Sequence, residues 1–294
     1  MEGGGSSLLQ SLLTPRRART LLGRLQRLLE HWERSITPPS PAMLQRWHVF
    51  RWRPNSWGGG GLVPVETFHP LPLDALLGID RAKEILLRNT RQFAAGLPAN
   101  NALLWGSRGT GKSSLVKAVA APFFPRLKLV EVHKDDLSAL PEIVQHLQIL
   151  TMPFLLFCDD LSFDRRDGSY KALKSILEGG VAGRPGNILL YATSNRRHLM
   201  ARDAAAESEE YHPMESAEEQ ISLSDRFGLW LGFHPFDQET YLRIVENSAR
   251  HLALAIPQEQ LCAEALAWAQ TRGARSGRVA HQFIIDLTGR LAAP

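Results

Sequence analysis

Residues 106–113 have the types and spacing of a loop that binds phosphate groups. The segment Gly106-Ser107-Arg108-Gly109-Thr110-Gly111-Lys112-Ser113 matches G-x-x-x-x-G-K-[S/T] at every fixed position. Glycines let a backbone turn around a phosphate, so that its N–H groups and the following helix N-terminus point at the anion. We expect Lys112 to neutralise the β- and γ-phosphates of ATP and Ser113 to ligate Mg²⁺. The alternative is a glycine-rich turn that only joins a strand to a helix.

Two neighbouring carboxylates follow an apolar segment further along the chain. The apolar run that starts at Phe154 ends in Asp159 and Asp160. The end of a strand places Asp159 beside the phosphates, where it holds Mg²⁺ through water, and Asp160 then polarises the attacking water. The alternative is a buried strand that runs into an acidic turn.

Asn195 is a third candidate, because it follows another apolar run that ends in polar residues at Thr193 and Ser194. An asparagine here is suited to hold the attacking water or the γ-phosphate. Ser and Asn also end strands for reasons of turn geometry alone. The position of Asn195, after the other two segments, favours the functional interpretation.

These residues need a scaffold in which strands and helices alternate. The patterns predict strands at 101–105, 128–132, 154–159, 188–193 and 230–233. They predict helices between these strands at 112–121, 138–147 and 170–178. Such alternation is typical of an α/β fold, a parallel sheet with helices on both faces. Three helical patterns then follow, at 237–252, 257–271 and 277–291, and they predict a small helical C-terminal domain.

One acidic stretch interrupts the alternation. Residues 203–222 are polar and contain six glutamates, so we expect a mobile loop there.

The first 60 residues differ in kind from the rest of the chain. They hold nine arginines against three glutamates, a net charge of +6, whereas the remainder carries −2. An amphipathic helix is expected to begin at Thr14-Pro15 and to end before Pro38. Residues 36–72 are expected to form an irregular linker with a short strand near Val49.

Arginine and tryptophan interleave within this linker, from Arg46 to Arg53. Cations between stacking surfaces suit single-stranded nucleic acid. The same residue types dominate protein interfaces. The third possibility is that the tryptophans pack the linker onto the core.

Composition restricts the class of protein. Hydrophobic residues make up 44% and charged residues 22%, which is typical of a soluble globular protein. The longest nearly apolar stretch, 149–158, is about half of what a bilayer-spanning helix needs. The first residues show no secretory signal pattern. Two cysteines are too few for a disulfide framework. We therefore expect a cytoplasmic protein.

The candidate segments together resemble the AAA+ ATPases. The motifs at 106–113 and 154–160 and the asparagine Asn195 come in AAA+ order and at AAA+-like spacing. Residues 223–227 resemble the motif that carries the AAA+ arginine finger, and residues 276–279 resemble sensor 2. The region from Arg226 to Leu291 is similar to bacterial replication initiators and helicase loaders. The sequence segments at 158–163 and 193–199 resemble those of a bacterial family of predicted AAA+ ATPases of unassigned function.

This resemblance implies ATP and Mg²⁺ as ligands and a role for each site residue. Arg226 would reach the γ-phosphate of a neighbouring subunit; the alternative is a surface ion pair with Asp225 or the acidic stretch. Arg278 would contact the γ-phosphate in its own subunit, with Arg275 as the alternative. Leu77-Gly78-Ile79 would line the adenine pocket. The residues expected to contact the nucleotide are Gly78, Ile79, Gly106, Ser107, Arg108, Gly109, Thr110, Gly111, Lys112, Ser113, Ser114 and Arg278.

Two departures from the AAA+ pattern bear on function. Most AAA+ proteins have glutamate where this chain has Asp160, which is one methylene shorter and puts the rate of hydrolysis in question. Residues 134–138 also lack the aromatic, apolar and glycine residues of a peptide-threading pore loop. Peptide threading is therefore disfavoured.

Three hypotheses follow for a chain divided into an N-terminal segment (1–72), an ATPase domain (73–236) and a helical lid (237–294). The first is a homo-oligomeric Mg²⁺-dependent ATPase that remodels or loads a protein or nucleic acid bound by the basic N-terminal segment. The second is a nucleotide-gated binding module with little or no hydrolysis, favoured by Asp160. The third is a DNA-associated loader or initiator.

Overall fold

A computed structural model of the chain describes residues 39–55, 59–163, 169–179, 183–197, 199 and 225–292. The helix expected after Thr14 and the acidic stretch at 203–222 lie outside these residues. Within the described ranges, no helix combines the length and the apolar character needed to cross a membrane.

The strands of the described chain form one sheet in the order β2-β1-β4-β5-β6-β3-β7. Their bounds are β1 Val49–Pro54, β2 Gly60–Pro64, β3 Ala102–Gly106, β4 Lys128–Val132, β5 Phe154–Cys158, β6 Ile188–Ser194 and β7 Leu229–Phe233. All neighbouring strands pair in parallel except the antiparallel pair β1 and β2. The carboxyl ends of β3, β5 and β6 therefore lie at one edge of the sheet, where the polar segments begin.

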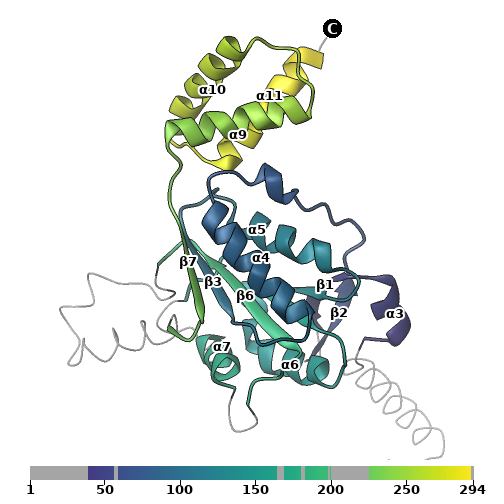
Figure 1. Ribbon diagram of the computed structural model, residues 1–294. Helices are drawn as coiled ribbons and strands as arrows, with labels where there is room; N and C mark the ends of the chain where they lie inside the picture. The colour runs from purple at the N-terminus through teal and green to yellow at the C-terminus, as the bar shows by residue number, and fades with distance from the viewer. Residues whose placement is uncertain are drawn as a thin grey trace, which may run out of the picture.

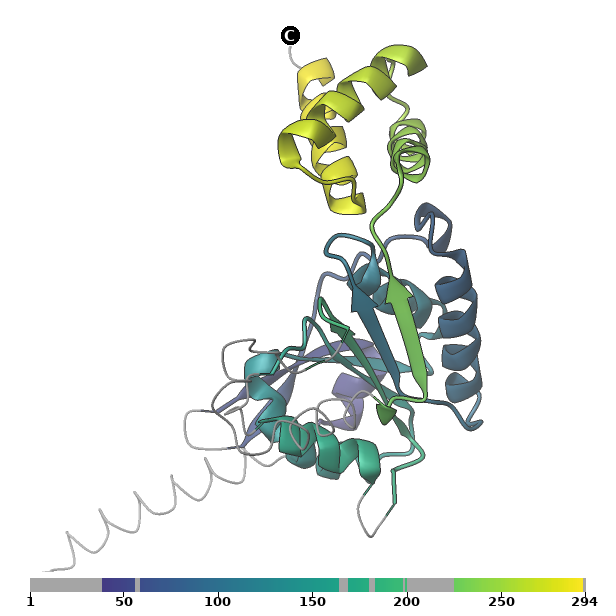
Figure 2. The same ribbon diagram turned by 90° about the vertical axis from the view of Figure 1, so that its left-hand side faces the viewer.

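Helices cover both faces of this sheet, as Figure 2 shows for α4 and α7. The helices of the α/β body are α3 Pro41–Arg46, α4 Asp80–Ala94, α5 Lys112–Ala120, α6 Leu140–Gln148 and α7 Ser169–Glu178, with short 3-10 turns at Leu73–Ala75 (η1), Ala121–Phe123 (η2) and Lys134–Ala139 (η3). Leu86 of α4 and Leu115 of α5 are fully buried in one core, and Ile143 of α6 and Leu173 of α7 are fully buried in the other. The predicted α/β class is confirmed, and the elements predicted after residue 100 are present to within two residues.

Three helices follow the last strand and pack around a core of their own. They are α9 Gln238–His251, α10 Gln258–Arg272 and α11 Gly277–Ala292. Tyr241, Ala265 and Phe283 lie at the centre of this core, each no more than 1% exposed. Figure 1 shows the helical lid above the edge of the sheet at which β3 and β7 end.

The strand expected near Val49 is present, but the segment around it is not an irregular linker, because it contributes two strands to the sheet. Residues 49–54 and 60–64 form a hairpin, and Val49 to Arg51 pair with β4. The alternation of arginine and aromatic residues is the period of a strand, because Phe50 and Trp52 are buried while Arg51 and Arg53 are exposed. For Trp52, and for the partly buried Trp47, packing on the core is therefore the correct interpretation.

Candidate functional site

The glycine-rich segment joins β3 to α5 at the edge of the sheet where polar residues follow three strands. The backbone at position 106 requires glycine, because φ is 131° and a Cβ atom there would lie 1.9 Å from the carbonyl oxygen of Phe233. The N–H of Ser107 donates to the same oxygen at 2.9 Å. The loop therefore begins in contact with the end of β7, where only glycine fits.

Several backbone N–H groups of this loop remain available for a ligand. Among the described residues, no hydrogen bond is donated by the backbone N–H groups of residues 109–114. Unpaired N–H groups at the start of a helix make an anion site, because the helix dipole adds to their partial positive charge. This arrangement fits the phosphates of a nucleotide.

Lys112 lies at the first position of α5 with its ammonium folded back over the loop. The Nζ atom donates to the carbonyl oxygens of Gly106 at 2.8 Å and Ser107 at 2.7 Å, and to Oδ1 of Asn195 at 3.2 Å. Burial lowers the pKa of Lys112, while the nearby carboxylates of Asp159 and Asp160 act in the opposite direction. The residue predicted to bind phosphate is therefore a partly desolvated cation inside the site.

Asp159 joins the ends of three segments that are distant in the sequence. Its Oδ1 accepts a hydrogen bond of 2.6 Å from the hydroxyl of Ser113. The same oxygen accepts a short hydrogen bond from the hydroxyl of Thr193. Thr193 was not predicted as a site residue; the signal for it was its place in the polar end of β6.

Asp160 has a left-handed backbone conformation, with φ of 55°. Aspartate enters this region more readily than most residues because its short polar side chain bonds locally. Its N–H donates to the hydroxyl of Thr193 at 2.9 Å, and its carboxylate accepts a short hydrogen bond from Nδ2 of Asn195. Asn195 therefore bridges Lys112 and Asp160.

Ser113 and Asp159 have the donor atoms that Mg²⁺ prefers. A hydroxyl and a carboxylate oxygen stand 2.6 Å apart beside the loop. In the described part of the chain, no three His, Cys, Asp or Glu residues are grouped as a metal cage. Mg²⁺ characteristically uses one or two protein oxygens together with water and substrate phosphates. The two residues therefore fit a Mg²⁺ ion that arrives with a nucleotide.

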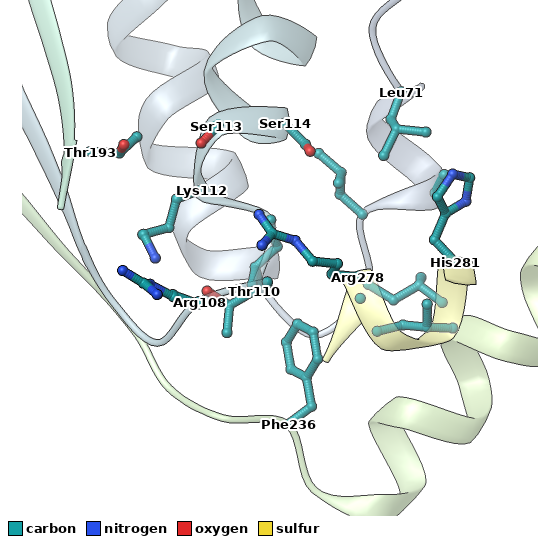
Figure 3. Close-up of a pocket in the computed structure, with 18 of the residues that line it drawn as sticks. Leu71, Arg108, Thr110, Lys112, Ser113, Ser114, Thr193, Phe236, Arg278 and His281 are labelled. Atoms are coloured by element: carbon teal, nitrogen blue, oxygen red, sulfur yellow. The ribbon is translucent and has the colours of Figure 1, made fainter. Parts of the chain in front are cut away.

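A cavity of about 770 Å³ lies between the α/β body and the lid (Figure 3). Its polar end contains the loop, both carboxylates and Asn195, and its other end is lined mainly by apolar side chains, with His281 among them. The lining residues are Leu71, Ala75, Leu76, Leu77, Ile79, Arg108, Gly109, Thr110, Gly111, Lys112, Ser113, Ser114, Asp159, Asp160, Thr193, Asn195, Phe236, Ile244, Ser248, Gly277, Arg278 and His281. One polar end and one apolar end are what a nucleoside triphosphate requires.

Five residues of the segment at 71–79 form the apolar wall: Leu71, Ala75, Leu76, Leu77 and Ile79. Gly78, which was predicted to contact the nucleotide, is not among the residues that line the cavity; it has φ of 75° and lies against Thr240. Lys83 of α4 holds this wall, since its Nζ donates to the carbonyl oxygens of Leu73 at 3.2 Å and Leu76 at 3.0 Å. This wall is where the resemblance places the adenine base.

The cavity is also lined by residues that the sequence reasoning did not single out, among them Phe236, just before the lid, and His281 of α11 (Figure 3). Arg278 lines the cavity, whereas the exposed Arg275 is not among the described residues that do so. The geometry thus favours Arg278 over Arg275 as the lid arginine.

Arg226 is a predicted site residue that the structure places away from the cavity. It precedes β7, whose far end pairs with Gly106, so it stands at the opposite edge of the sheet. Its side chain pairs with Glu178 of α7, with N–O distances of 2.6 and 2.8 Å. If Arg226 contacts ATP, that ATP must therefore be bound by a neighbouring subunit.

The mostly parallel sheet, the loop between β3 and α5 and the helical lid together form an AAA+-like α/β fold. The chain belongs to the family described as "Protein of unknown function (DUF815)", which matches residues 45–291. The predicted family resemblance is thereby confirmed.

The chain is similar to proteins of known structure and to one curated protein. The Orc1 protein of Aeropyrum pernix, solved in complex with DNA, aligns with a TM-score of 0.51 and 17% identity, covering 71% of this chain and 61% of that one. The RuvB Holliday junction branch migration motor of Thermotoga maritima aligns with a TM-score of 0.43 and 16% identity, over 73% and 71% of the two chains. Among curated proteins, the replication factor C large subunit of Ignicoccus hospitalis is 31% identical over 74 residues, which are 24% of this chain and only 15% of that protein.

Proposed function

We propose that this chain binds ATP with Mg²⁺ and hydrolyses the γ-phosphate, as a member of an assembly of identical subunits. One observation carries this proposal. Lys112, Asn195 and Asp160 form a continuous hydrogen-bonded chain at the polar end of a cavity large enough for a nucleotide. A turn that merely connects β3 to α5 has no need of such a chain.

Each residue of this group has a role that follows from its contacts. The loop N–H groups and the Lys112 ammonium bind the phosphates, while Ser113 and Asp159 would hold Mg²⁺. The ion supplies positive charge to the phosphate oxygens when it is bound. Asp160 orients a water molecule toward the γ-phosphorus, and Asn195 holds the Asp160 carboxylate in place.

The test of nucleotide binding is Lys112→Ala, with Lys117→Ala on the same helix as the matched control. Removing the buried ammonium should weaken ATP binding by about 100-fold or more, because its charge-assisted contacts with the phosphates are lost. Lys117 does not line the cavity, so its loss should leave the affinity unchanged. Calorimetry decides, and equal ATP affinities for the two variants would refute the phosphate-site assignment.

A nucleotide-gated binding module is the second candidate, and Asp160 is the observation that favours it. Its side chain is short, its backbone is left-handed, and its carboxylate already accepts a hydrogen bond from Asn195. An aspartate engaged in this way can report the presence of the γ-phosphate through Asn195 without activating water.

Asp160→Asn separates the two candidates, since asparagine also tolerates the left-handed conformation. If Asp160 activates water, turnover should fall on the order of 100-fold while ATP affinity is kept. In a gated module, the wild-type chain would hydrolyse almost nothing and would change its assembly state with ATP but not with ADP. Single-turnover hydrolysis and light scattering on both proteins distinguish these results.

A further inference from the structure

Arg108 is a cation within the phosphate-binding loop itself. It occupies a variable position of the motif, between Ser107 and Gly109, and its side chain lines the cavity. Figure 3 shows Arg108 and Lys112 on the same side of the cavity, with Arg278 extending from the lid. Three cations from one subunit therefore surround the region proposed for the β- and γ-phosphates.

The two arginines differ from Lys112 in having no polar partner in the described part of the chain. Within the described residues, the guanidinium groups of Arg108 and Arg278 make no hydrogen bond and no ion pair, although Lys112 has three acceptors. Each planar guanidinium thus keeps its donors for two oxygens of one phosphate. Arg226, by contrast, is engaged with Glu178.

The backbone on which Arg108 stands is held in place by a close contact. Gly109 has a φ of 74°, and a Cβ atom there would lie 2.7 Å from Oγ of Ser276 and 3.2 Å from Cβ of Arg278. Loop and lid therefore touch at this glycine. Arg278 belongs to the lid, whereas Arg108 is part of the loop proposed to bind the phosphates, so its position is fixed relative to that loop.

We infer that Arg108 is a catalytic arginine supplied in cis, which contacts γ-phosphate oxygens and supports hydrolysis within a single subunit. This inference rests on the proposed ATP hydrolysis. In the reaction, the oxygen of water bonds to the γ-phosphorus and the bond to the β–γ bridging oxygen breaks. ADP leaves with that electron pair, and the water protons pass to inorganic phosphate and solvent. Charge accumulates on the equatorial γ-oxygens, where an arginine lowers the barrier.

The experiment compares wild-type protein with Arg108→Ala, Arg108→Lys and the control Arg88→Ala, which removes an exposed arginine on α4. Three quantities are measured for each: the Kd for Mg²⁺–ADP, the Kd for Mg²⁺–ADP with aluminium fluoride, and turnover at several protein concentrations. ADP with aluminium fluoride imitates the γ-phosphoryl group in transit, so its affinity reports transition-state contacts without requiring turnover.

For Arg108→Ala, we expect turnover to fall about 100-fold and affinity for the aluminium fluoride complex to fall by a similar factor. The Kd for ADP should change by less than about threefold, since ADP lacks the γ-phosphate. Arg108→Lys should recover little, because lysine lacks the planar fork. Arg88→Ala should behave as wild type.

Wild-type turnover and wild-type aluminium fluoride affinity in Arg108→Ala would overturn the inference. An equal loss of affinity for ADP and for the aluminium fluoride complex would also overturn it, because Arg108 would then bind the ground state only. Failure of the proposed function looks different: the wild-type chain itself would bind neither nucleotide. Circular dichroism and thermal melting of each variant identify a folding defect, and Arg108→Lys then supplies the comparison.

Discussion

Ser113 donates a 2.6 Å hydrogen bond to Asp159, although the two residues are 46 positions apart in the chain. This contact joins the start of α5 to the end of β5, and it exists because β3 and β5 run parallel and end at the same edge of the sheet. The hydroxyl and the carboxylate are the two oxygen donors proposed for Mg²⁺.

Loss of either donor should therefore weaken the binding of Mg²⁺ more than the binding of the nucleotide. For Ser113→Ala and Asp159→Asn, we expect the Mg²⁺ concentration at half-maximal hydrolysis to rise about tenfold. Binding of ADP without metal should be unchanged, as calorimetry in EDTA can measure. Asp135→Asn, an exposed aspartate on η3, is the control. Normal turnover of Asp159→Asn at limiting Mg²⁺ would exclude this role.

Arg226 should matter only when subunits assemble. We expect Arg226→Ala to keep its ATP affinity but to lose the rise in specific activity with protein concentration. In the assembled state, its turnover should be on the order of 1000-fold lower than that of wild type. The ion pair with Glu178 does not prevent such a role, since a partly exposed pair contributes only about 0.2–1 kcal/mol.

Mixing two variants that each lack the assembly-dependent activity tests whether Arg226 acts across an interface. Arg226→Ala mixed with Lys112→Ala should recover part of the activity, because an intact loop then meets an intact Arg226. If the mixture stays inactive and wild-type activity is independent of concentration, Arg226 has a structural role at Glu178.

Two truncations should differ sharply in stability. Removal of residues 1–38 leaves every described strand in place, so ATP affinity should be kept. Removal of residues 1–60 deletes β1, and with it Phe50 and Trp52, which are 0% and 3% exposed. Side chains of this kind contribute about 3–5 kcal/mol each when buried. The longer truncation should therefore fail to fold, as circular dichroism and thermal melting can show.

The shorter truncation also tests the proposed partner contact. Residues 1–38 carry six arginines against three glutamates. If they bind nucleic acid, the intact chain should bind single strands with an affinity that falls steeply as salt rises, and the truncated chain should not bind. Equal binding by the two proteins would show that the nucleic-acid contact lies outside residues 1–38.

Acid should loosen the contact between β1 and β4 through His48. The Nζ of Lys128 lies 3.0 Å from Nδ1 of His48, and burial together with this cation lowers the pKa of His48 below 6.5. The unfolded chain therefore binds the proton more readily, so the stabilising contribution is present above about pH 6.5 and is lost as pH falls through the folded pKa.

The measurement compares wild type with His48→Gln, which keeps an acceptor for Lys128 but does not titrate. Between about pH 7.5 and 5.5, the free energy of unfolding of wild type should fall further than that of the variant. The difference should stay below the roughly 1.4 kcal/mol of one pKa unit, because the ring is partly exposed and solvent screens it. Parallel curves for the two proteins would contradict this account.

The local pattern of the sequence was sufficient to predict the loop at 106–113 and the alternating strands and helices that hold it. Glycine spacing at 106–111 and the apolar runs before Asp159 and Asn195 are short-range signals, because backbone conformation and burial act on neighbouring residues. The fold class and the helical lid followed from the same patterns.

Tertiary structure decided the matters that depend on pairing between distant segments. The run from Arg46 to Arg53 is compatible with a nucleic-acid surface or a strand, and only its pairing with β4 makes it a strand with buried Trp52. The sequence patterns did not indicate Glu178 as a partner of Arg226, because the two residues are 48 positions apart and only the fold brings them together. Arg108 and Arg278, 170 positions apart, line one cavity because Gly109 lets the loop touch the lid. The sequence determines which residues carry charge, and the folded chain determines which charges share a site.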